Sequence, residues 1–220
     1  MEFAYSFAGL VVGFIVGLTG IGGGALMTPI LIVVFGIPPV TAVSTDLLYA
    51  AITKGGGIFS YAKKKLVEYK IVLLLLSGSL PGSLLTLHYL KGLDGLEQVE
   101  HLMNLTLGVS LVLTSIAVFF RNKIRAKALE WQDTAFAHHG RRWRPYITVA
   151  MGLVLGGLVT LSSVGAGALG TALLILLYPR MSMPAIVGTD LLHAVVLTAV
   201  AGAGHYGMGN VDLTLLIYLV

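Results

Sequence analysis

Two distant stretches decide the fold: residues 9–36 read GLVVGFIVGLTGIGGGALMTPILIVVFG, and residues 152–179 read GLVLGGLVTLSSVGAGALGTALLILLYP. Neither stretch contains a charged side chain, and each has a cluster of small residues near its middle followed by Gly-x-Gly-Ala-Leu. Farther along, Thr-Asp-Leu-Leu occurs at 45–48 and again at 189–192, at nearly the same offset. A shared order of motifs at constant spacing indicates internal duplication.

The composition indicates a membrane protein. Of the 220 residues 56% are hydrophobic and 11% are charged, whereas a soluble domain is about 25% charged. So few charges cannot cover a soluble globule, which argues against a soluble enzyme, a nucleic-acid partner and a disordered chain. With no cysteine and no motif such as Gly-x-Ser-x-Gly or His-Glu-x-x-His, we expect no enzyme, no catalytic residue, no metal and no cofactor.

Apolar segments long enough to cross a bilayer are expected at 41–60, 68–90, 102–120, 146–161 and 185–203. The longer stretches 3–36 and 146–178 are interrupted by glycines. A last segment begins at Val211 and is still apolar at Val220, after only about 15 Å of helix. We therefore expect a first membrane repeat at 1–120, a linker at 121–145 and a second repeat at 146–220 that is truncated at its C-terminal end.

The basic residues predict how the segments are oriented. Eleven of the 14 Lys and Arg residues lie at 63–70 and 121–144, while 91–101 is acidic and 204–212 has no basic residue. The positive-inside rule then places the 121–145 loop in the cytoplasm of a bacterial-type inner membrane. Segments 41–60 and 185–203 run in opposite directions as a result. The predicted fold class is an all-α polytopic membrane protein with two inverted-topology repeats and glycine-broken helices, a pattern typical of secondary transporters.

The two glycine clusters are the predicted substrate site. Several glycines within a few residues favour a break in a helix, and a broken helix exposes backbone N–H groups and a positive dipole end that suit a compact anion. The open alternative is that these glycines serve close helix packing. The candidate residues in the clusters are Gly20, Gly22, Gly23, Gly24, Ser162, Ser163, Gly165 and Gly167.

The Thr-Asp motifs add further candidates, because Ser44, Thr45 and Thr189 offer hydroxyl ligands beside Asp46 and Asp190. Each aspartate follows a proline by a few residues, so one interpretation places it in the first turn of a helix as a cap. The other interpretation is proton coupling, since ionisable groups inside a membrane are functional candidates by default.

Two other ionisable residues lie inside predicted membrane helices. His193 follows Thr189 by one helical turn and could relay protons or bond to a neighbouring helix. Lys54 could extend to the cytoplasmic surface, or it could pair with an anion. We take Asp46, Asp190, His193 and Lys54 as candidates for proton coupling or anion pairing.

These motifs resemble one family, the TauE/SafE group of sulfite exporters, over essentially the whole chain. The resemblance lies in the 13–24 glycine pattern with Pro29, in 162–167, and in Val187-Gly188-Thr189-Asp190-x-x-His193-Ala194. It implies a multi-pass permease in the lipid bilayer for a small sulfur anion, such as sulfite or an organosulfonate. Members usually continue with another helix like the one containing Ser77–Gly82. The predicted function is secondary transport by alternating access, and a homo-oligomer is possible. The alternative function is that of a non-transporting membrane subunit or sensor.

Overall fold

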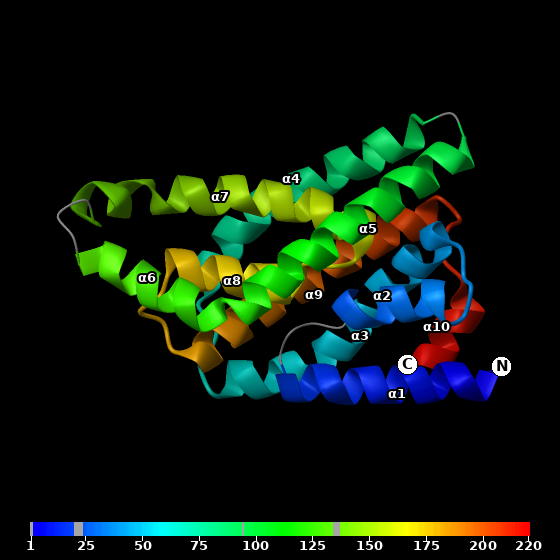
Figure 1. Cartoon of the computed structure of the whole chain (residues 1–220), viewed down its shortest axis with the longest axis horizontal. Helices are drawn as coiled ribbons and strands as arrows, with labels where there is room; N and C mark the ends of the chain where they lie inside the picture. Colours follow the sequence, from blue (N-terminus) through cyan, green and yellow to red (C-terminus); the bar gives the residue numbers. More distant parts are fainter. Residues whose placement is uncertain (1, 20–23, 94, 134–136) are drawn as a thin grey trace.

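The computed structural model describes residues 2–19, 24–93, 95–133 and 137–220, and all regular structure within them is helical (Figure 1). This confirms the all-α prediction. The helices are α1 (Glu2–Thr19), α2 (Gly24–Val33), α3 (Pro39–Lys63), α4 (Tyr69–Lys91), α5 (Leu96–Phe119), α6 (Arg121–Asp133), α7 (Ala137–Ser162), α8 (Ala168–Leu177), α9 (Met183–Gly207) and α10 (Leu213–Leu219).

Four of these helical segments are long and apolar enough to cross a membrane: α4, α5, Arg142–Ser162 of α7, and α9. Helix α3 is as long as α9 but is not among them, although we expected a span at 41–60. The reason is its polar content, which includes Ser44, Thr45, Asp46 and Lys54, all buried inside the protein. Large apolar side chains are instead exposed on α1, α4 and α5, as on a surface that faces lipid.

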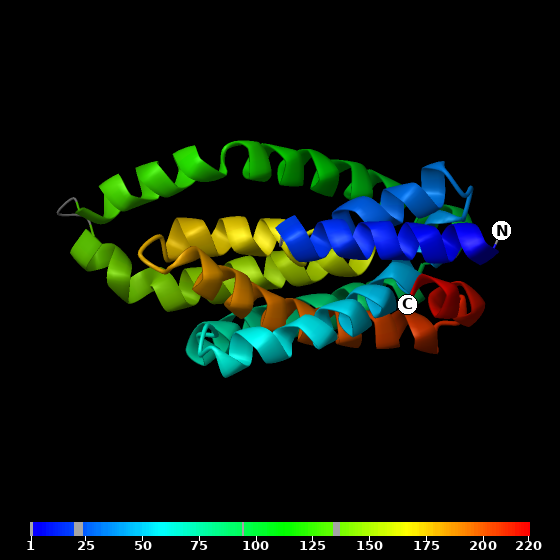
Figure 2. The same ribbon diagram turned by 90° about the horizontal axis from the view of Figure 1, so that it is seen from below.

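The chain reverses direction between α7 and α8. Helix α7 runs toward the middle of the molecule and α8 runs back from it, in both views (Figures 1 and 2). Helices α1 and α2 run in opposite directions in the same way. The segment 163–167 is therefore the tip of a helical hairpin, whereas the sequence suggested an interruption in one spanning helix. The residues expected to break the first helix, 20–23, lie outside the described part of the chain.

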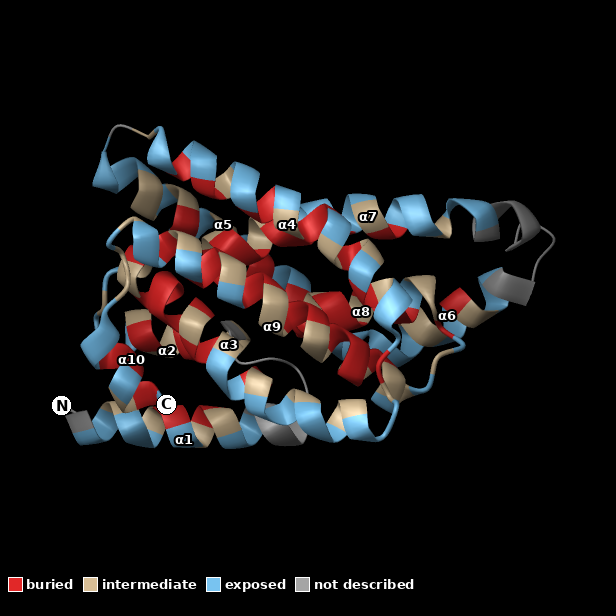
Figure 3. Cartoon of the chain, turned by 180° about the vertical axis from the view of Figure 1, so that it is seen from behind, coloured by how far each residue is buried: buried red, intermediate tan, exposed pale blue. Residues whose placement is uncertain are grey.

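The two helices that carry the Thr-Asp-Leu-Leu motifs point in opposite directions. Helix α3 runs from right to left in Figure 1, whereas α9 runs from left to right, and the two pack against each other. The α3–α4 turn and helix α6, both rich in basic residues, lie at the same end of the molecule. Buried residues concentrate on α3, α8 and α9 in the interior (Figure 3).

The two halves are interlocked. Helix α4 of the first half packs mainly on α7 and α9 of the second, while α10 of the second half packs on α1 and α3 of the first. Matching glycines make these contacts possible. A Cβ atom added to Gly152 would lie 2.6 Å from the carbonyl oxygen of Leu75 in α4, and one added to Gly9 would overlap that of Leu219 in α10. Each half therefore contributes one helix to the other.

Much of the glycine excess outside the predicted clusters serves this packing. A Cβ atom on Gly78, Gly82 or Gly156 would overlap a backbone carbonyl of the facing helix in the α4–α7 pair. Such close approach is typical of small-residue helix interfaces in membranes. Close packing is thus shown at these glycines of α4 and α7, and the choice between a site and packing at the two clusters stays open.

Candidate functional site

The tip between α7 and α8 has a backbone shape that requires glycine. Gly165 and Gly167 have φ angles of +116° and +143°, and Ser163 adopts a φ of +58°, which is uncommon for a residue with a side chain. Helix α7 ends at Ser162, and α8 begins at Ala168. Of the first cluster, Gly24 opens α2, while Gly20, Gly22 and Gly23 lie outside the described residues.

The start of α8 is less open than the sequence suggested. A carbonyl of the tip accepts two backbone hydrogen bonds: Gly167 N donates to Gly165 O at 2.8 Å, and Gly170 N donates to the same oxygen at 3.1 Å. Two of the N–H groups that a helix start leaves unpaired are thus already bonded. An anion at this end of α8 would depend more on side chains and on the helix dipole.

Asp46 and Asp190 are buried carboxylates that make equivalent contacts in the two halves of the chain. Thr28 Oγ1 in α2 donates to Asp46 Oδ2, and Thr171 Oγ1 in α8 donates to Asp190 Oδ2 at 3.0 Å. In each carboxylate the other oxygen, Oδ1, is buried without a hydrogen-bond partner. The Thr28–Asp46 and Thr171–Asp190 contacts therefore have the same arrangement in the two halves.

The capping interpretation of these aspartates is wrong. Asp46 lies about two turns inside α3, and Asp190 is equally deep in α9. Helix α3 begins after Pro38 with no side-chain cap, and α9 is capped by Ser182, whose hydroxyl accepts from Ala185 N. The prolines lie at the helix starts themselves, so the acids face the protein interior.

Lys54 does not extend to the surface. Its side chain is buried, and its ammonium group donates a hydrogen bond to the carbonyl oxygen of Ala166 at the α7–α8 tip. It also interacts electrostatically with both Asp46 and Asp190. The surface interpretation failed because α3 packs on α9, so that this face of α3 lies inside the protein. Lys54 instead joins a helix of the first half to the tip in the second.

His193 forms the predicted bond to a neighbouring helix. Its Nε2 lies 2.9 Å from Ser79 Oγ in α4, while Nδ1 is buried without a partner. Its counterpart in the first half, Tyr49, donates to the carbonyl of Gly9 in α1 at 2.9 Å. The hydrogen bond gives His193 a positioning contact, and proton relay by this ring stays a prediction.

The predicted hydroxyl ligands divide into two kinds. Thr45 Oγ1 in α3 accepts from Asp212 N, directly before α10, at 3.1 Å, and Thr189 Oγ1 in α9 accepts from Glu68 N, directly before α4, at 3.0 Å, so each holds the start of a helix of the other half. Ser44 Oγ, by contrast, is buried without a partner. Threonine hydroxyls that are committed in this way have less capacity left for a ligand.

The two serines of the tip also differ. Ser162 Oγ donates to Leu158 O at 2.6 Å and contacts Ser110 Oγ in α5 at 3.2 Å. Ser163 Oγ lies beside Asp46 without a hydrogen bond of normal geometry, and it is fully buried. Ser163 is therefore the tip hydroxyl with free hydrogen-bonding capacity.

Five of these side chains gather around Lys54 and form what we call the central polar cluster: Asp46, Lys54, Ser163, Asp190 and His193. Four of the five carry a buried polar atom without a partner, and the fifth, Lys54, donates a hydrogen bond to a backbone carbonyl. Ser44 lies two residues before Asp46 and so faces another side of α3. No group of three or more acidic or histidine residues suited to a metal ion occurs among the described residues. Side chains of these kinds can bind a charged ligand and can hold or release a proton within a membrane.

Sequence reasoning missed Thr28, Thr171, Gly170 and Ser79. The alignment of the two halves already pairs Thr28 with Thr171, so the signal for these two was present. Gly170 was not distinguishable, because its role is close approach: a Cβ atom there would overlap Asp190 Oδ1. Its counterpart in the first half is Met27.

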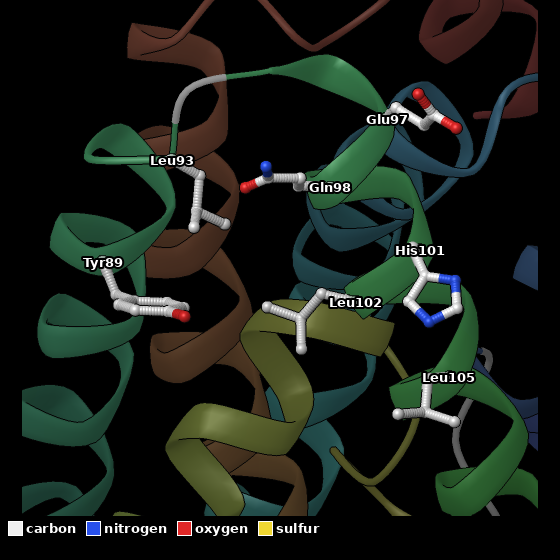
Figure 4. Close-up of a pocket in the computed structure, with 7 residues that line it drawn as sticks. All are labelled: Tyr89, Leu93, Glu97, Gln98, His101, Leu102 and Leu105. Atoms are coloured by element: carbon white, nitrogen blue, oxygen red, sulfur yellow. The ribbon is translucent and has the colours of Figure 1, made fainter.

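A separate cavity of about 470 Å³ lies at the α4–α5 turn, far from the tip (Figure 4). Tyr89 lines it from α4, Leu93 from the turn, and Gln98 and Leu102 from α5. None of the residues predicted from the sequence borders it. It is a surface feature of the end opposite to the basic turns.

Comparisons with known proteins identify the family of the chain. Residues 5–220 match the family described as sulfite exporter TauE/SafE. The chain is 38% identical over 209 residues to the probable membrane transporter protein YjnA of Bacillus subtilis, covering 93% of this chain and 79% of that protein. The probable membrane transporter proteins YunE and YdhB of the same organism are 25% and 26% identical, over 93% and 94% of this chain and 78% and 80% of theirs. No solved structure gives a significant match. With these helices and this match over nearly its whole length, the chain belongs to the TauE/SafE family of membrane transporters.

Proposed function

We propose that the protein is a secondary transporter for a small sulfur anion, either sulfite or an organosulfonate, and that it works by alternating access. The observation that carries the proposal is the central polar cluster. It lies where α3 packs on α9 and beside the α7–α8 tip, whose Ala166 carbonyl Lys54 contacts, and it is buried away from solvent. Ionisable groups inside a membrane protein are expensive to bury and mark transport pathways.

The matched contacts support an inverted repeat. The pairs are Thr28–Asp46 with Thr171–Asp190, Asp212–Thr45 with Glu68–Thr189, and Gly9–Leu219 with Gly152–Leu75. In each pair both partners occupy equivalent positions of the two halves, and helices α3 and α9 run in opposite directions. Two similar units with a shared interface can exchange their roles, which is the geometric basis of alternating access.

The chemistry around the tip suits an oxyanion. Lys54 brings a positive charge to the tip, and the start of α8 adds a partial positive charge from its dipole. Ser163 supplies a buried hydroxyl group without a hydrogen-bond partner. A sulfite or sulfonate group presents three oxygens to such donors.

We further propose that the basic turns face the cytoplasm of a bacterial-type inner membrane. The α3–α4 turn, helix α6 and the first turns of α7 share one end of the molecule, as the positive-inside rule requires. The predicted linker 121–145 contains α6 and the beginning of α7, between the repeat regions 1–120 and 146–220. Homo-oligomerisation stays a prediction.

Uptake into proteoliposomes tests the transport proposal. Purified protein should move labelled sulfite or methanesulfonate faster than protein-free vesicles, and Lys54→Gln should abolish most of this flux because it removes the charge at the tip. Lys91→Gln is the matched control, since Lys91 is exposed at the end of α4. Equal fluxes for Lys54→Gln and wild type, or no flux of any sulfur anion, would contradict the proposal.

The second candidate is a non-transporting membrane subunit or sensor. The observation in its favour is that Gly78, Gly82, Gly152 and Gly156 serve packing alone. Gly167→Ala separates the two candidates, because a side chain at a φ of +143° distorts the tip. Loss of ligand binding with an intact fold supports a site, whereas loss of the fold alone supports packing.

A further inference from the structure

Asp190 occupies the place where an anion would bind to α8. Its Oδ2 accepts from Thr171, in the first turn of α8, at 3.0 Å. Its Oδ1 lies so close to Gly170 that a Cβ atom there would overlap it. A helix start attracts negative charge through its dipole. In this structure that position is filled by the protein's own carboxylate.

Asp46 is seated in the same way near the start of α2, through its bond from Thr28. An independent observation concerns the atoms that remain: Oδ1 of Asp46, Oδ1 of Asp190 and Oγ of Ser163 are all buried without partners. A buried carboxylate oxygen without a partner is costly when charged. A proton bound to either carboxylate would relieve that cost.

The charge balance of the cluster points in the same direction. Asp46 and Asp190 face one positive group, Lys54, so the cluster carries a net charge of −1 when all three are ionised. The other titratable groups that face it are Tyr49 on α3 and His193 on α9. The side chains that α2, α8 and the tip bring to the carboxylates are the neutral hydroxyls of Thr28, Thr171 and Ser163. An added anion would leave two uncompensated negative charges in a poorly solvated interior.

We propose that Asp46 and Asp190 are built-in competitors of the transported anion, and that the anion therefore binds together with a proton. A proton from solvent forms an O–H bond on one carboxylate, which then gives up the helix start to the anion. When the anion and the proton leave on the other side of the membrane, the carboxylate returns to the helix start. This inference rests on the proposed function and assigns the coupling ion to it.

Binding measured against pH tests the proposal. The probe is labelled methanesulfonate, because its sulfonate group keeps one charge throughout the neutral range. If methanesulfonate does not bind, sulfite is used, and its own titration between HSO3⁻ and SO3²⁻ is corrected for. The affinity of the purified wild-type protein should rise as pH falls, by up to about tenfold per pH unit for one coupled proton.

Variants of Asp46 and Asp190 test whether these carboxylates compete with the anion. Asp46→Asn and Asp190→Asn should each weaken the pH dependence, and the double variant should bind the probe at alkaline pH more tightly than wild type. Glu97→Gln, at an exposed carboxylate, is the control and should keep the wild-type profile. Thr171→Val keeps Asp190 but removes the hydroxyl that holds its carboxylate at the start of α8. This variant should bind the probe more tightly than wild type at alkaline pH, and its affinity should still depend on pH.

Three results would overturn the inference. Wild-type affinity that does not change with pH excludes proton uptake, and a double variant with the wild-type pH slope excludes these carboxylates as its source. If labelled anion crosses proteoliposomes without any pH dependence, the inference falls while the transport proposal stands. If wild-type protein neither binds nor moves a sulfur anion, both fall together. Size-exclusion profiles identify variants that fail to fold, and Thr171→Val then carries the comparison.

Discussion

The close contact between Gly170 and Asp190 yields a sharp prediction about stability. A Cβ atom added at Gly170 would overlap Asp190 Oδ1, and both residues are buried. We expect Gly170→Ala to lower the free energy of unfolding by about 1–3 kcal/mol, the usual range for overpacking a core. Alanine itself favours a helix by about 1 kcal/mol over glycine, so the clash must be larger than the net loss.

Removing the Asp190 carboxylate should turn the destabilising effect of Gly170→Ala into a stabilising one. In an Asp190→Ala background nothing opposes the new methyl group, and Gly170→Ala should then stabilise the protein by up to about 1 kcal/mol. The expected coupling between the two sites is therefore about 2–4 kcal/mol, far above the scatter of independent mutations. Equilibrium unfolding in detergent measures all four proteins of the cycle. Gly108→Ala in α5 is the control, because nothing lies within 4 Å of its added Cβ atom. Additive effects would refute the contact.

Three further predictions follow from single residues. Ser182→Ala removes the only side-chain hydrogen bond at the start of α9 and should cost about 1 kcal/mol of stability without changing anion flux, as thermal unfolding and uptake measure. Gly82→Ala should cost about 1–3 kcal/mol, because its Cβ atom would overlap the backbone of Leu153, and the loss should appear in the same unfolding assay. The chain has no cysteine, so Lys64→Cys and Lys91→Cys should react with an impermeant thiol reagent from opposite sides of the membrane; labelling from the same side would contradict the orientation.

Sequence reasoning found the elements but not their mutual contacts. The periodic apolar segments and the positions of the basic residues predicted the helices, because hydrophobic length and charge act locally along the chain. The hairpin at 163–167 was read as a broken helix because glycine content shows where a helix stops and not which way the chain leaves. The sequence left two interpretations of Lys54 open, the cytoplasmic surface and an anion partner, because its burial depends on α9, which is more than 120 residues away in sequence. Its partner Ala166 gives no signal in the sequence at all.

The departures from symmetry say more about mechanism than the symmetry does. The counterpart of Lys54 in the second half is Thr198, which donates to Ala194 within its own helix, so the cluster has two carboxylates but only one ammonium. The counterpart of Gly170 is Met27, so the first half has no glycine at the position that lets Asp190 approach α8. A strictly symmetric site would hold both carboxylates equally, and neither would yield first to a proton. Lys54 shares α3 with Asp46 and bonds the tip of the second half, so the movement of the halves that the proposed transport requires would change its distance to Asp190 and with it the charge balance of the cluster.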